Sequence, residues 1–444
     1  MLPAFSSFNL PASVVSALTR QGITTPTPVQ VAVIPDALAG HNVLGRARTG
    51  SGKTLSFGIP VLARIAGGRR RPKAPRAIIL LPTRELATQV RTALDPIASA
   101  LGLKMATVYG GMPINRQMSQ LREGVDLVVA TPGRLTDLIE RRACTLEAVE
   151  IIALDEADHL CDLGFYKPID RLLGMTPASG QRLLLSATLD GDVNRLVSRH
   201  LPKHVLHEIA TDDADEGVME HHVLVAPATG KFEAARGLLE ANPRTIVFTR
   251  TRRGATRLAR QLTTTGIDAV DLHGDLAQNK REANLRRFSK GDASVIVATD
   301  IAARGIHVDD VKLVVHYDAP AEHKAYTHRS GRTARAGESG TVVTMTTPDA
   351  VRDVVQLQRK AGVTARHHDA ATAPKPLTAA SLSTSGVDGP SLTDSSRGGS
   401  RPSRSGGGRP SGNGGGGRPF GNGGNRPAGN GGGGPRGRRR QPSR

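Results

Sequence analysis

The sequence contains no tryptophan and only two cysteines, Cys144 and Cys161, among its 444 residues. Two cysteines cannot build the disulfide framework of a small secreted domain, and so low a number is typical of a reducing compartment. No apolar run approaches the roughly 20 residues that a membrane-spanning helix needs. The first 20 residues carry no charge before Arg20 and no long apolar core, so no signal peptide is expected. These absences favour a cytoplasmic protein without a membrane segment.

Acidic residues are scarce relative to basic ones, and the imbalance is uneven along the chain. The net charge is +19, and the stretch 395–444 contributes 11 arginines and no acidic residue. An excess of this size is typical of proteins that bind a polyanion. A tail that merely keeps the protein soluble is the alternative, but its arginine-rich composition favours the polyanion.

Short apolar runs alternate with helical patterns from residue 1 to 210. The runs are nearly continuous in Val, Ile and Leu, as in strands that are buried on both faces of a parallel sheet. They lie at 42–46, 76–82, 125–131, 150–155 and 181–188. Helical patterns such as 83–101 separate them, which predicts a domain of βαβ units over 1–210.

The alternation restarts after an acidic break at 211–220. Five further apolar runs lie at 221–226, 244–249, 294–300, 311–317 and 340–346. They predict a second α/β domain over 221–365, with 211–220 as the linker; one large sheet with an insertion is the alternative. From 366 to 444 the chain is rich in Ala, Thr, Ser, Gly and Arg, and we predict a disordered tail because it cannot bury enough apolar surface to fold.

The segment GRARTGSGKTLSF at 45–57 nearly spells a phosphate-binding loop, but Ala47 stands where the general pattern has glycine. A strand precedes the loop and a helical pattern follows it, which is the context that the motif requires. Lys53 is then placed to reach the β- and γ-phosphates of a nucleotide, and Thr54 to bind a magnesium ion. The loop alone leaves open a simple Gly/Ser turn that contains a lysine.

Two carboxylates, Asp155 and Glu156, follow the buried run at 150–154. We expect Asp155 to hold Mg²⁺ through water, and Glu156 to position or deprotonate an attacking water. Acidic residues also stabilise helix N-termini without any chemistry. The lysine of the phosphate loop in the same domain favours the nucleotide site.

These and further motifs resemble the DEAD-box ATP-dependent RNA helicases, in the family's order, over residues 5–346. DEAD at 155–158, SAT at 186–188 and HRSGRTARAG at 328–337 carry the resemblance. The other matching segments are Phe5 with GITTPTPVQ (22–30), ARTGSGKT (47–54), PTRELA (82–87), GG (110–111), TPGR (131–134), IVFTRT (246–251), QNKR (278–281) and ATDIAARGI (298–306). Motif I begins with alanine in this family, so Ala47 does not disqualify the loop.

The resemblance implies two tandem RecA-like domains that bind ATP and Mg²⁺. It implies that Gln30 reads the adenine edge, that Phe5 packs on the ring, and that Arg332 and Arg335 act as arginine fingers beside Lys53, Asp155 and Glu156 in catalysis. The other nucleotide-binding positions that it implies are Ala47, Arg48, Thr49, Gly50, Ser51, Gly52 and Thr54. Because the fingers belong to the second domain, hydrolysis requires the domains to close.

The resemblance also implies RNA as the partner. The implied RNA-binding residues are Pro82, Thr83, Arg84, Gly110, Gly111, Thr131, Pro132, Gly133, Arg134, Arg250, Gln278, Arg281, Thr299 and Asp300. The implied coupling residues are Asp158, Ser186, Thr188, His307 and His328. With 3% aromatic residues, few bases can be read by stacking, so we expect contacts to phosphate and 2′-hydroxyl groups with little sequence preference.

Three positions depart from the common family pattern. His307 replaces an aspartate that contacts the nucleotide across the cleft, which raises the hypothesis of a pH-sensitive coupling. Ala334 replaces a glycine, and Arg48 replaces a glutamine. Drift within the lineage is the simpler interpretation of all three.

The leading hypothesis is an RNA-dependent ATPase, expected to be a monomer, that unwinds short duplexes locally or displaces proteins. A DNA translocase of the same superfamily is one alternative, and an RNA chaperone that acts through its basic tail is another. Ribosome assembly, RNA degradation and cold adaptation stay open as cellular roles, with ribosomal precursors or RNA-decay proteins as partners.

Overall fold

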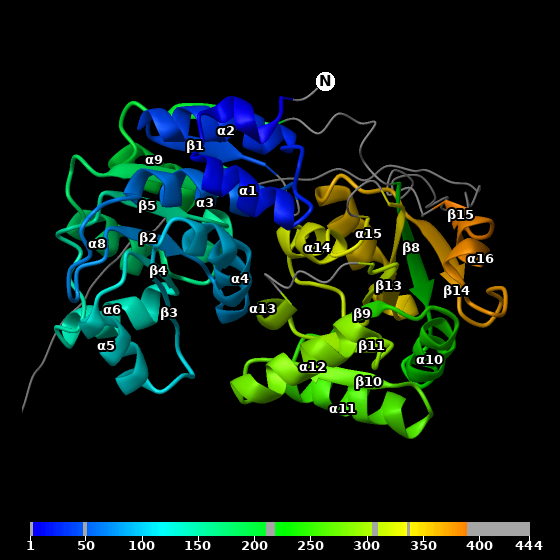
Figure 1. Ribbon diagram of the computed structural model, residues 1–444. Coiled ribbons are helices and arrows are strands. Elements are labelled where there is room, and N and C mark those ends of the chain that lie inside the picture. Colours follow the sequence, from blue (N-terminus) through cyan, green and yellow to red (C-terminus); the bar gives the residue numbers. More distant parts are fainter. Residues whose placement is uncertain (1–2, 48–50, 210–217, 304–309, 335–337, 389–444) are drawn as a thin grey trace, which may run out of the picture. The chain divides into compact units, whose positions relative to one another are not determined.

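A computed structural model describes residues 3–47, 51–209, 218–303, 310–334 and 338–388. Within these residues the chain forms two parallel β-sheets, each with helices along both faces (Figure 1). None of the helices in this part of the chain is long and apolar enough to cross a membrane.

The first domain runs from the N-terminal helical turn to the strand β7. Its elements are η1 (Phe5–Phe8), α1 (Ala12–Arg20), α2 (Pro28–Ala39), β1 (Val43–Arg46), α3 (Lys53–Ile65), β2 (Ala77–Leu80), α4 (Arg84–Ala100), β3 (Met105–Val108), α5 (Ile114–Glu123), β4 (Leu127–Ala130), α6 (Pro132–Glu140), β5 (Ile151–Leu154), α7 (Ala157–Asp162), α8 (Tyr166–Met175), β6 (Gln181–Ser186), α9 (Gly191–His200) and β7 (Val205–Glu208).

The second domain runs from β8 to the end of the described chain. Its elements are β8 (Met219–Val225), α10 (Lys231–Ala241), β9 (Thr245–Phe248), α11 (Arg252–Thr264), β10 (Ala269–Leu272), α12 (Gln278–Lys290), β11 (Val295–Ala298), α13 (Asp300–Ala303), β12 (Leu313–His316), α14 (His323–Ser330), β13 (Gly340–Thr346), η3 (Pro348–Ala350), α15 (Val351–Lys360), β14 (Arg366–Asp369), α16 (Ala379–Ser383) and β15 (Val387–Asp388).

The two sheets have the same topology. The first has the strand order β3-β4-β2-β5-β6-β1-β7, and the second has β10-β11-β9-β12-β13-β8-β14-β15. Each of the first seven strands of the second sheet therefore occupies the place of the strand seven positions earlier in the chain. All neighbouring strands are parallel except β14 and β15, which are antiparallel. Two α/β domains of one type, as the sequence predicted, account for this repetition.

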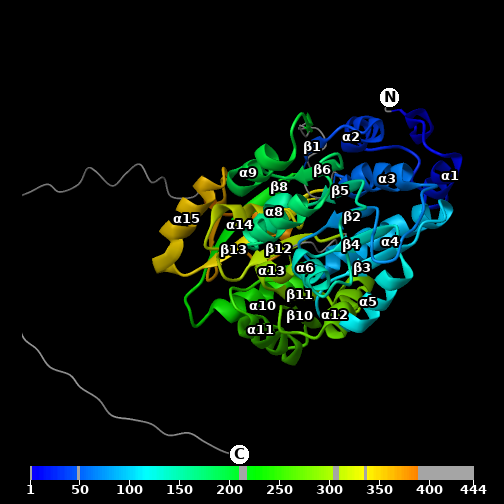
Figure 2. The same cartoon turned by 90° about the vertical axis from the view of Figure 1, so that its left-hand side faces the viewer.

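Alternate side chains of each central strand point to opposite layers of helices. In β2, Ala77 and Ile79 pack with α1 to α4, whereas Ile78 and Leu80 pack with α5 to α9. Figure 2 shows α3 and α4 on one side of β2 and β5, and α8 on the other. All four side chains of β2 are fully buried. This two-sided burial explains why the strand sequences are continuously apolar. Because the strands are parallel, the polar residues that follow them all lie at the carboxyl ends of the strands.

The strands that the apolar pattern did not predict lie at or near the sheet edges. β3 and β7 are the two edges of the first sheet, and β10 is an edge of the second. β7 alternates between half-buried and exposed side chains. β3 (MATV) and β10 (AVDL) are mostly buried, but a threonine or an aspartate interrupts their apolar residues. They therefore lack the uninterrupted apolar run on which the prediction depended.

The predicted boundary at residue 365 is wrong, because the second domain continues to residue 388. β14 pairs in parallel with β8, and its sequence RHHD has no apolar residue to reveal it. Leu377 and Leu382 are buried in the core of the second domain. The predicted linker, 211–220, also ends too late, since β8 begins at Met219.

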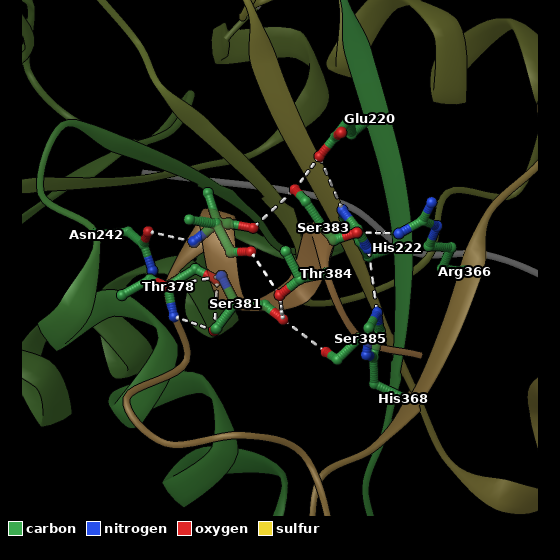
Figure 3. A network of polar contacts seen from close by, with 12 residues as sticks. Glu220, His222, Asn242, Arg366, His368, Thr378, Ser381, Ser383, Thr384 and Ser385 are labelled. Atoms are coloured by element: carbon green, nitrogen blue, oxygen red, sulfur yellow. Dashed lines mark hydrogen bonds and ion pairs between the residues drawn. The ribbon is translucent and has the colours of Figure 1, made fainter. Parts of the chain in front are cut away.

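Polar contacts fasten this C-terminal segment to the domain (Figure 3). Asn242 at the end of α10 donates from Nδ2 to the carbonyl of Leu377 at 2.7 Å and accepts from the amide of Ala379 at 3.0 Å. The hydroxyl of Ser383 contacts the Glu220 carboxylate of β8. Residues 366–388 are thus an integral part of the second domain.

Candidate functional site

The phosphate loop leads from β1 to α3, and its lysine folds back over the loop. Lys53 is the first residue of α3 and is 5% exposed. Its Nζ donates to the carbonyl of Ala47 at 2.9 Å. The ammonium group therefore lies at the helix N-terminus, where an anion is stabilised. Arg48, Thr49 and Gly50 of the same loop lie outside the described residues.

Gly52 is required by both its backbone angle and its neighbours. Its φ is +92°, and a Cβ atom there would lie 2.7 Å from Gln30 Nε2 and 2.8 Å from Thr27 Oγ1. Gln30 Nε2 donates to the Gly52 carbonyl at 3.0 Å, and Gln30 Oε1 accepts from the Thr27 amide at 3.0 Å. The GITTPTPVQ segment thus holds the phosphate loop directly, a contact that the sequence did not reveal.

The adenine contacts implied for Gln30 and Phe5 stay predictions. Both ends of the Gln30 amide bind the protein's own backbone in this structure. Phe5 is 2% exposed in the core of the first domain, with its ring edge-on to Phe8 at a centroid distance of 6.1 Å.

Asp155 is a deeply buried carboxylate beside Lys53. It follows β5 and is 4% exposed. Burial raises its pKa to about 7, and the charge of Lys53 offsets only part of this. An under-compensated carboxylate of this kind is suited to a divalent cation. Among the described residues no group of three or more His, Cys, Asp or Glu side chains could hold a metal ion.

Glu156 adopts a left-handed backbone conformation, with φ of +50°, at the start of α7. Such strain in a non-glycine residue is concentrated at functional sites. Burial raises its pKa, but the hydrogen bond and charge of His159, followed by the charges of Arg332 and Lys53, lower it to about 2. Glu156 is therefore ionised at neutral pH. His159 was not among the residues singled out from the sequence.

The last residue of DEAD connects to SAT through three hydrogen bonds, and a fourth lies within SAT. The Asp158 amide donates to Ser186 Oγ at 3.1 Å, and Ser186 Oγ donates to the Thr188 carbonyl at 2.7 Å. Asp158 Oδ2 accepts from both the amide and the hydroxyl of Thr188, at 3.0 and 3.1 Å. Three of the predicted coupling residues thus form one buried network between the ends of β5 and β6.

The HRSGRTARAG segment places Arg332 within electrostatic reach of Glu156. Arg332 is 6% exposed, and its Nε donates to the His328 carbonyl at 3.3 Å. Its positive charge contributes to the lowered pKa of Glu156. Arg335 and His307, which were predicted as a second finger and a coupling residue, lie outside the described residues.

Arg329 is a further residue that the sequence analysis missed. It is 3% exposed and binds both carboxylate oxygens of Asp300, from Nε to Oδ1 and from Nη2 to Oδ2. Asp300 was predicted to bind RNA, but here its carboxylate is occupied by Arg329. The pairing of HRSGR with ATDIAARGI was available only from the fold.

Arg84 lies beside Gly110 and Gly111, within electrostatic reach of arginines from two other predicted RNA-binding motifs. Burial lowers the pKa of Arg84, Glu85 opposes the shift, and the charges of Arg281 and Arg134 add to it. A Cβ atom at Gly111 would come within 2.2 Å of Arg84 Nη1, so the glycine makes room for the guanidinium group. Like charges that crowd together in this way favour an anionic ligand.

Two of these arginines also have partners within the chain. Arg281 Nη2 lies 2.9 Å from Glu85 Oε1, and Gln278 Nε2 lies 3.5 Å from the same oxygen. Arg134 Nη1 donates to the Met112 carbonyl at 3.1 Å. The glutamate of PTRELA therefore positions the QNKR segment, a role that the sequence analysis did not assign.

The other predicted RNA-binding residues lie mainly at strand ends and helix starts. Thr83 caps α4 by accepting from the Leu86 amide at 3.3 Å. The side chains of Pro82, Thr131, Pro132, Gln278 and Thr299 are buried, whereas Gly133 and Arg250 are exposed. A direct RNA contact of each stays a prediction.

A buried lysine at the N-terminus of the helix after β1 and carboxylates at the end of β5, two strands away in the same sheet, define a nucleotide-binding site on one of two equivalent sheets. This arrangement is that of a tandem RecA-like nucleotide-binding protein. Residues 27–196 match the family described as DEAD/DEAH box helicase, and residues 230–337 match the helicase conserved C-terminal domain. The chain belongs to the DEAD-box helicase family.

Individual relatives agree with this assignment. The chain is 42% identical over 348 residues to the ATP-dependent RNA helicase RhlB of Xanthomonas axonopodis pv. citri, covering 76% of this chain and 61% of that protein, which is less than two thirds of its length. It is 38% identical to the DEAD-box ATP-dependent RNA helicase CshA of Bacillus subtilis, covering 78% of this chain and 70% of that protein. The fold is similar to S. cerevisiae Dbp5 bound to RNA and ADP BeF3, with a TM-score of 0.73, 25% identity, and coverage of 83% and 96%.

Proposed function

We propose that this protein is an ATP-dependent RNA helicase, in which RNA-stimulated ATP hydrolysis drives local, non-processive strand separation or the remodelling of RNA–protein complexes. The observation that carries the proposal is the buried cluster of Lys53, Asp155 and Glu156, joined through Asp158 to the network of Ser186 and Thr188. The printed names of RhlB and CshA, and the RNA in the Dbp5 structure, support the same function.

The chain's own residues suggest how hydrolysis proceeds. Lys53 neutralises charge on the transferred phosphoryl group, Glu156 orients the attacking water, and Arg332 stabilises the negative charge that develops in the transition state. A finger of this kind accelerates phosphoryl transfer by about 10³–10⁵-fold. Arg335 is proposed as a second finger on the basis of the motif alone.

Magnesium fits the site because Asp155 is a buried carboxylate whose charge Lys53 only partly offsets. Asp155, mostly through water, and Thr54 would hold the ion. When bound, Mg²⁺ would neutralise charge on the phosphate oxygens and so favour the departure of ADP as the leaving group.

RNA is proposed to bind along the arginines of PTRELA, TPGR and QNKR, with little sequence preference. Closure of the two domains on ATP would bend one strand and expel its partner, and the Asp158–Ser186–Thr188 network would communicate the nucleotide state to this surface. The arginine-rich stretch 395–444 is proposed as an additional RNA tether.

The biological setting belongs to the proposal as well. A monomeric cytoplasmic protein that acts in ribosome assembly or RNA degradation, with ribosomal precursors or decay proteins as partners, is consistent with the basic charge of the chain.

The decisive test is Glu156→Gln, measured in ATPase assays with RNA, with DNA and without nucleic acid. The wild type should hydrolyse ATP faster with RNA than with DNA, and the variant should lose this turnover while it still binds RNA, because glutamine cannot accept a proton as the carboxylate does. Equal stimulation by DNA would favour the translocase alternative. Duplex remodelling by Glu156→Gln without ATP would favour the RNA chaperone.

A further inference from the structure

His159 contacts the carboxylate that the proposed reaction uses. It lies on the short helix α7, three residues after Glu156, and its Nδ1 is 3.0 Å from Glu156 Oε2. His159 is 4% exposed and Glu156 is 7% exposed, so water competes little for this bond. The contact is made by the His159 side chain alone, and it depends on the spacing of three residues between Glu156 and His159.

The chemistry of the two groups determines the direction of the bond. The contact joins Glu156 Oε2 to His159 Nδ1 at 3.0 Å, and an ionised carboxylate oxygen can only accept. Nδ1 must therefore carry the proton and donate. Within the described part of the chain, His159 Nε2 is buried and has no hydrogen-bond partner. The ring is thus oriented by its bond to Glu156 and by packing.

The carboxylate needs such support because its backbone provides little. Glu156 occupies the left-handed position before the first turn of α7, and no helix cap holds its side chain. A glutamate side chain has several rotatable bonds, and freezing them costs free energy that a fixed partner can offset. A displacement of about 1 Å at a reacting group can cost about 100-fold in rate.

We propose that His159 is a positioning residue for Glu156: Nδ1–H holds Oε2 and leaves Oε1 to face the attacking water. This proposal rests on the proposed ATPase function and deepens it by naming the group that orients the general base. His159 itself does not touch the nucleotide in this scheme.

Three substitutions at this position separate Nδ1 donation from bulk and from the second ring nitrogen. Asparagine places an amide nitrogen near the position of Nδ1, glutamine places it nearer that of Nε2, and leucine fills the space without a donor. We expect His159→Leu and His159→Gln to lower kcat by roughly 10- to 100-fold, whereas His159→Asn retains most of it. The KM for ATP should stay close to that of the wild type in all three.

His200 provides a matched control in the same domain. It is also a buried histidine bound to a carboxylate, with Nε2 at 2.7 Å from Asp170 Oδ1, but it belongs to α9 and Asp170 to α8. His200→Asn should lower the thermal midpoint of the full chain without lowering kcat. Thermal midpoints of the His159 variants identify any loss of activity that arises from unfolding.

The possible results distinguish the positioning role from the proposed function. Wild-type kcat in His159→Leu would overturn the positioning role while RNA-stimulated turnover of the wild type upholds the proposed function. Equal losses in the Asn, Gln and Leu variants at unchanged thermal midpoints would also overturn it, because donation from Nδ1 would then be irrelevant. If the wild type has no RNA-stimulated turnover, the proposed function fails and the role of His159 fails with it.

Discussion

Ala334 has a φ of +52°, in the left-handed region that an alanine rarely occupies. The resemblance to the family implies that alanine replaces a glycine common in this motif, and the backbone angle gives that substitution a physical cost. The residue lies directly after Arg332 and Thr333, both of which are buried. Strain is therefore stored next to the proposed finger.

Restoring glycine at this position should stabilise the protein. Ala334→Gly removes the clash of Cβ in the left-handed conformation, worth about 1 kcal/mol, less the entropy that glycine gains in the unfolded chain. Denaturant unfolding of the full chain should show a higher midpoint. The control is Ala325→Gly on α14, where the same change in a helix interior should destabilise by up to about 1 kcal/mol. A lower midpoint in both variants would contradict the strain.

Motif spacing was sufficient to single out Lys53 and Asp155, which are both buried, at the start of α3 and directly after β5. It could not predict contacts that depend on side-chain direction. The bond from His159 to Glu156 and the pair of Arg329 with Asp300 arise from the rotation of short helices at strand ends. Such geometry is decided by packing.

At the scale of elements, the strands of the second domain carry histidines that are half-buried or buried. His221 of β8 lies 3.0 Å from the Tyr326 hydroxyl, and His368 of β14 lies 3.1 Å from His222. Burial, together with the charge of His222, lowers the pKa of His221 and of His368 to about 4. Burial also lowers the pKa of His316 of β12 far below its ordinary value.

These histidines predict acid sensitivity of the second domain. Unfolded histidines bind protons below the ordinary pKa of 6.5, whereas the folded ones stay neutral down to about 4. The unfolded state therefore binds more protons in this window, and stability falls as the pH drops from 6.5 towards 4. Thermal unfolding of the full chain, followed by circular dichroism across this range, should show the loss.

His368→Gln is the matched variant for this prediction. Glutamine can reproduce the nitrogen that contacts His222, but it does not titrate. Its thermal midpoint should fall less steeply between pH 6.5 and 4 than that of the wild type. Identical pH profiles would show that His368 does not contribute to the acid sensitivity.

At the scale of the whole molecule, the repeated strand order shows where the second domain ends. β14 occupies the place that β7 has in the first sheet, so a domain that stops at residue 365 lacks one strand of the repeat. Residues 366–388 are mostly polar or small, so their composition resembles that of residues 389–444. Only the pairing with β8 and the burial of Leu377 and Leu382 reveal its role.

Two truncations test this boundary and the proposed tether together. A chain that ends after residue 388 should keep its thermal midpoint and its RNA-stimulated ATPase. It should bind single-stranded RNA with a flatter salt dependence, by about 0.7 in slope for each phosphate group that the tail no longer neutralises. In a chain that ends after residue 365, the second domain should no longer show a cooperative thermal unfolding transition, because β14 and two core leucines are removed.

The control for the contribution of the buried leucines to stability is Leu382→Ala in the chain that ends after residue 388. It should destabilise the chain by roughly 2–5 kcal/mol, as expected for a fully buried leucine. Thr384→Ala on the exposed side of the same segment should be nearly neutral. Equal stability of the chains that end after residues 365 and 388 would contradict the domain boundary at 388. An unchanged salt slope of RNA binding in the chain that ends after residue 388 would contradict the proposed RNA tether.

The sequence by itself determined the α/β class, the two domains, the central strands and the residues of the phosphate loop and DEAD motif. It could do so because buried parallel strands require continuous apolar runs, and phosphate chemistry requires particular side chains at short, fixed spacings. Tertiary structure alone decided the edge strands, the packing of 366–388 against the second domain, the hydrogen bond from Gln30 to Gly52 and the contact between His159 and Glu156. These features join residues far apart in the chain or depend on how a side chain is turned, and no local pattern records either.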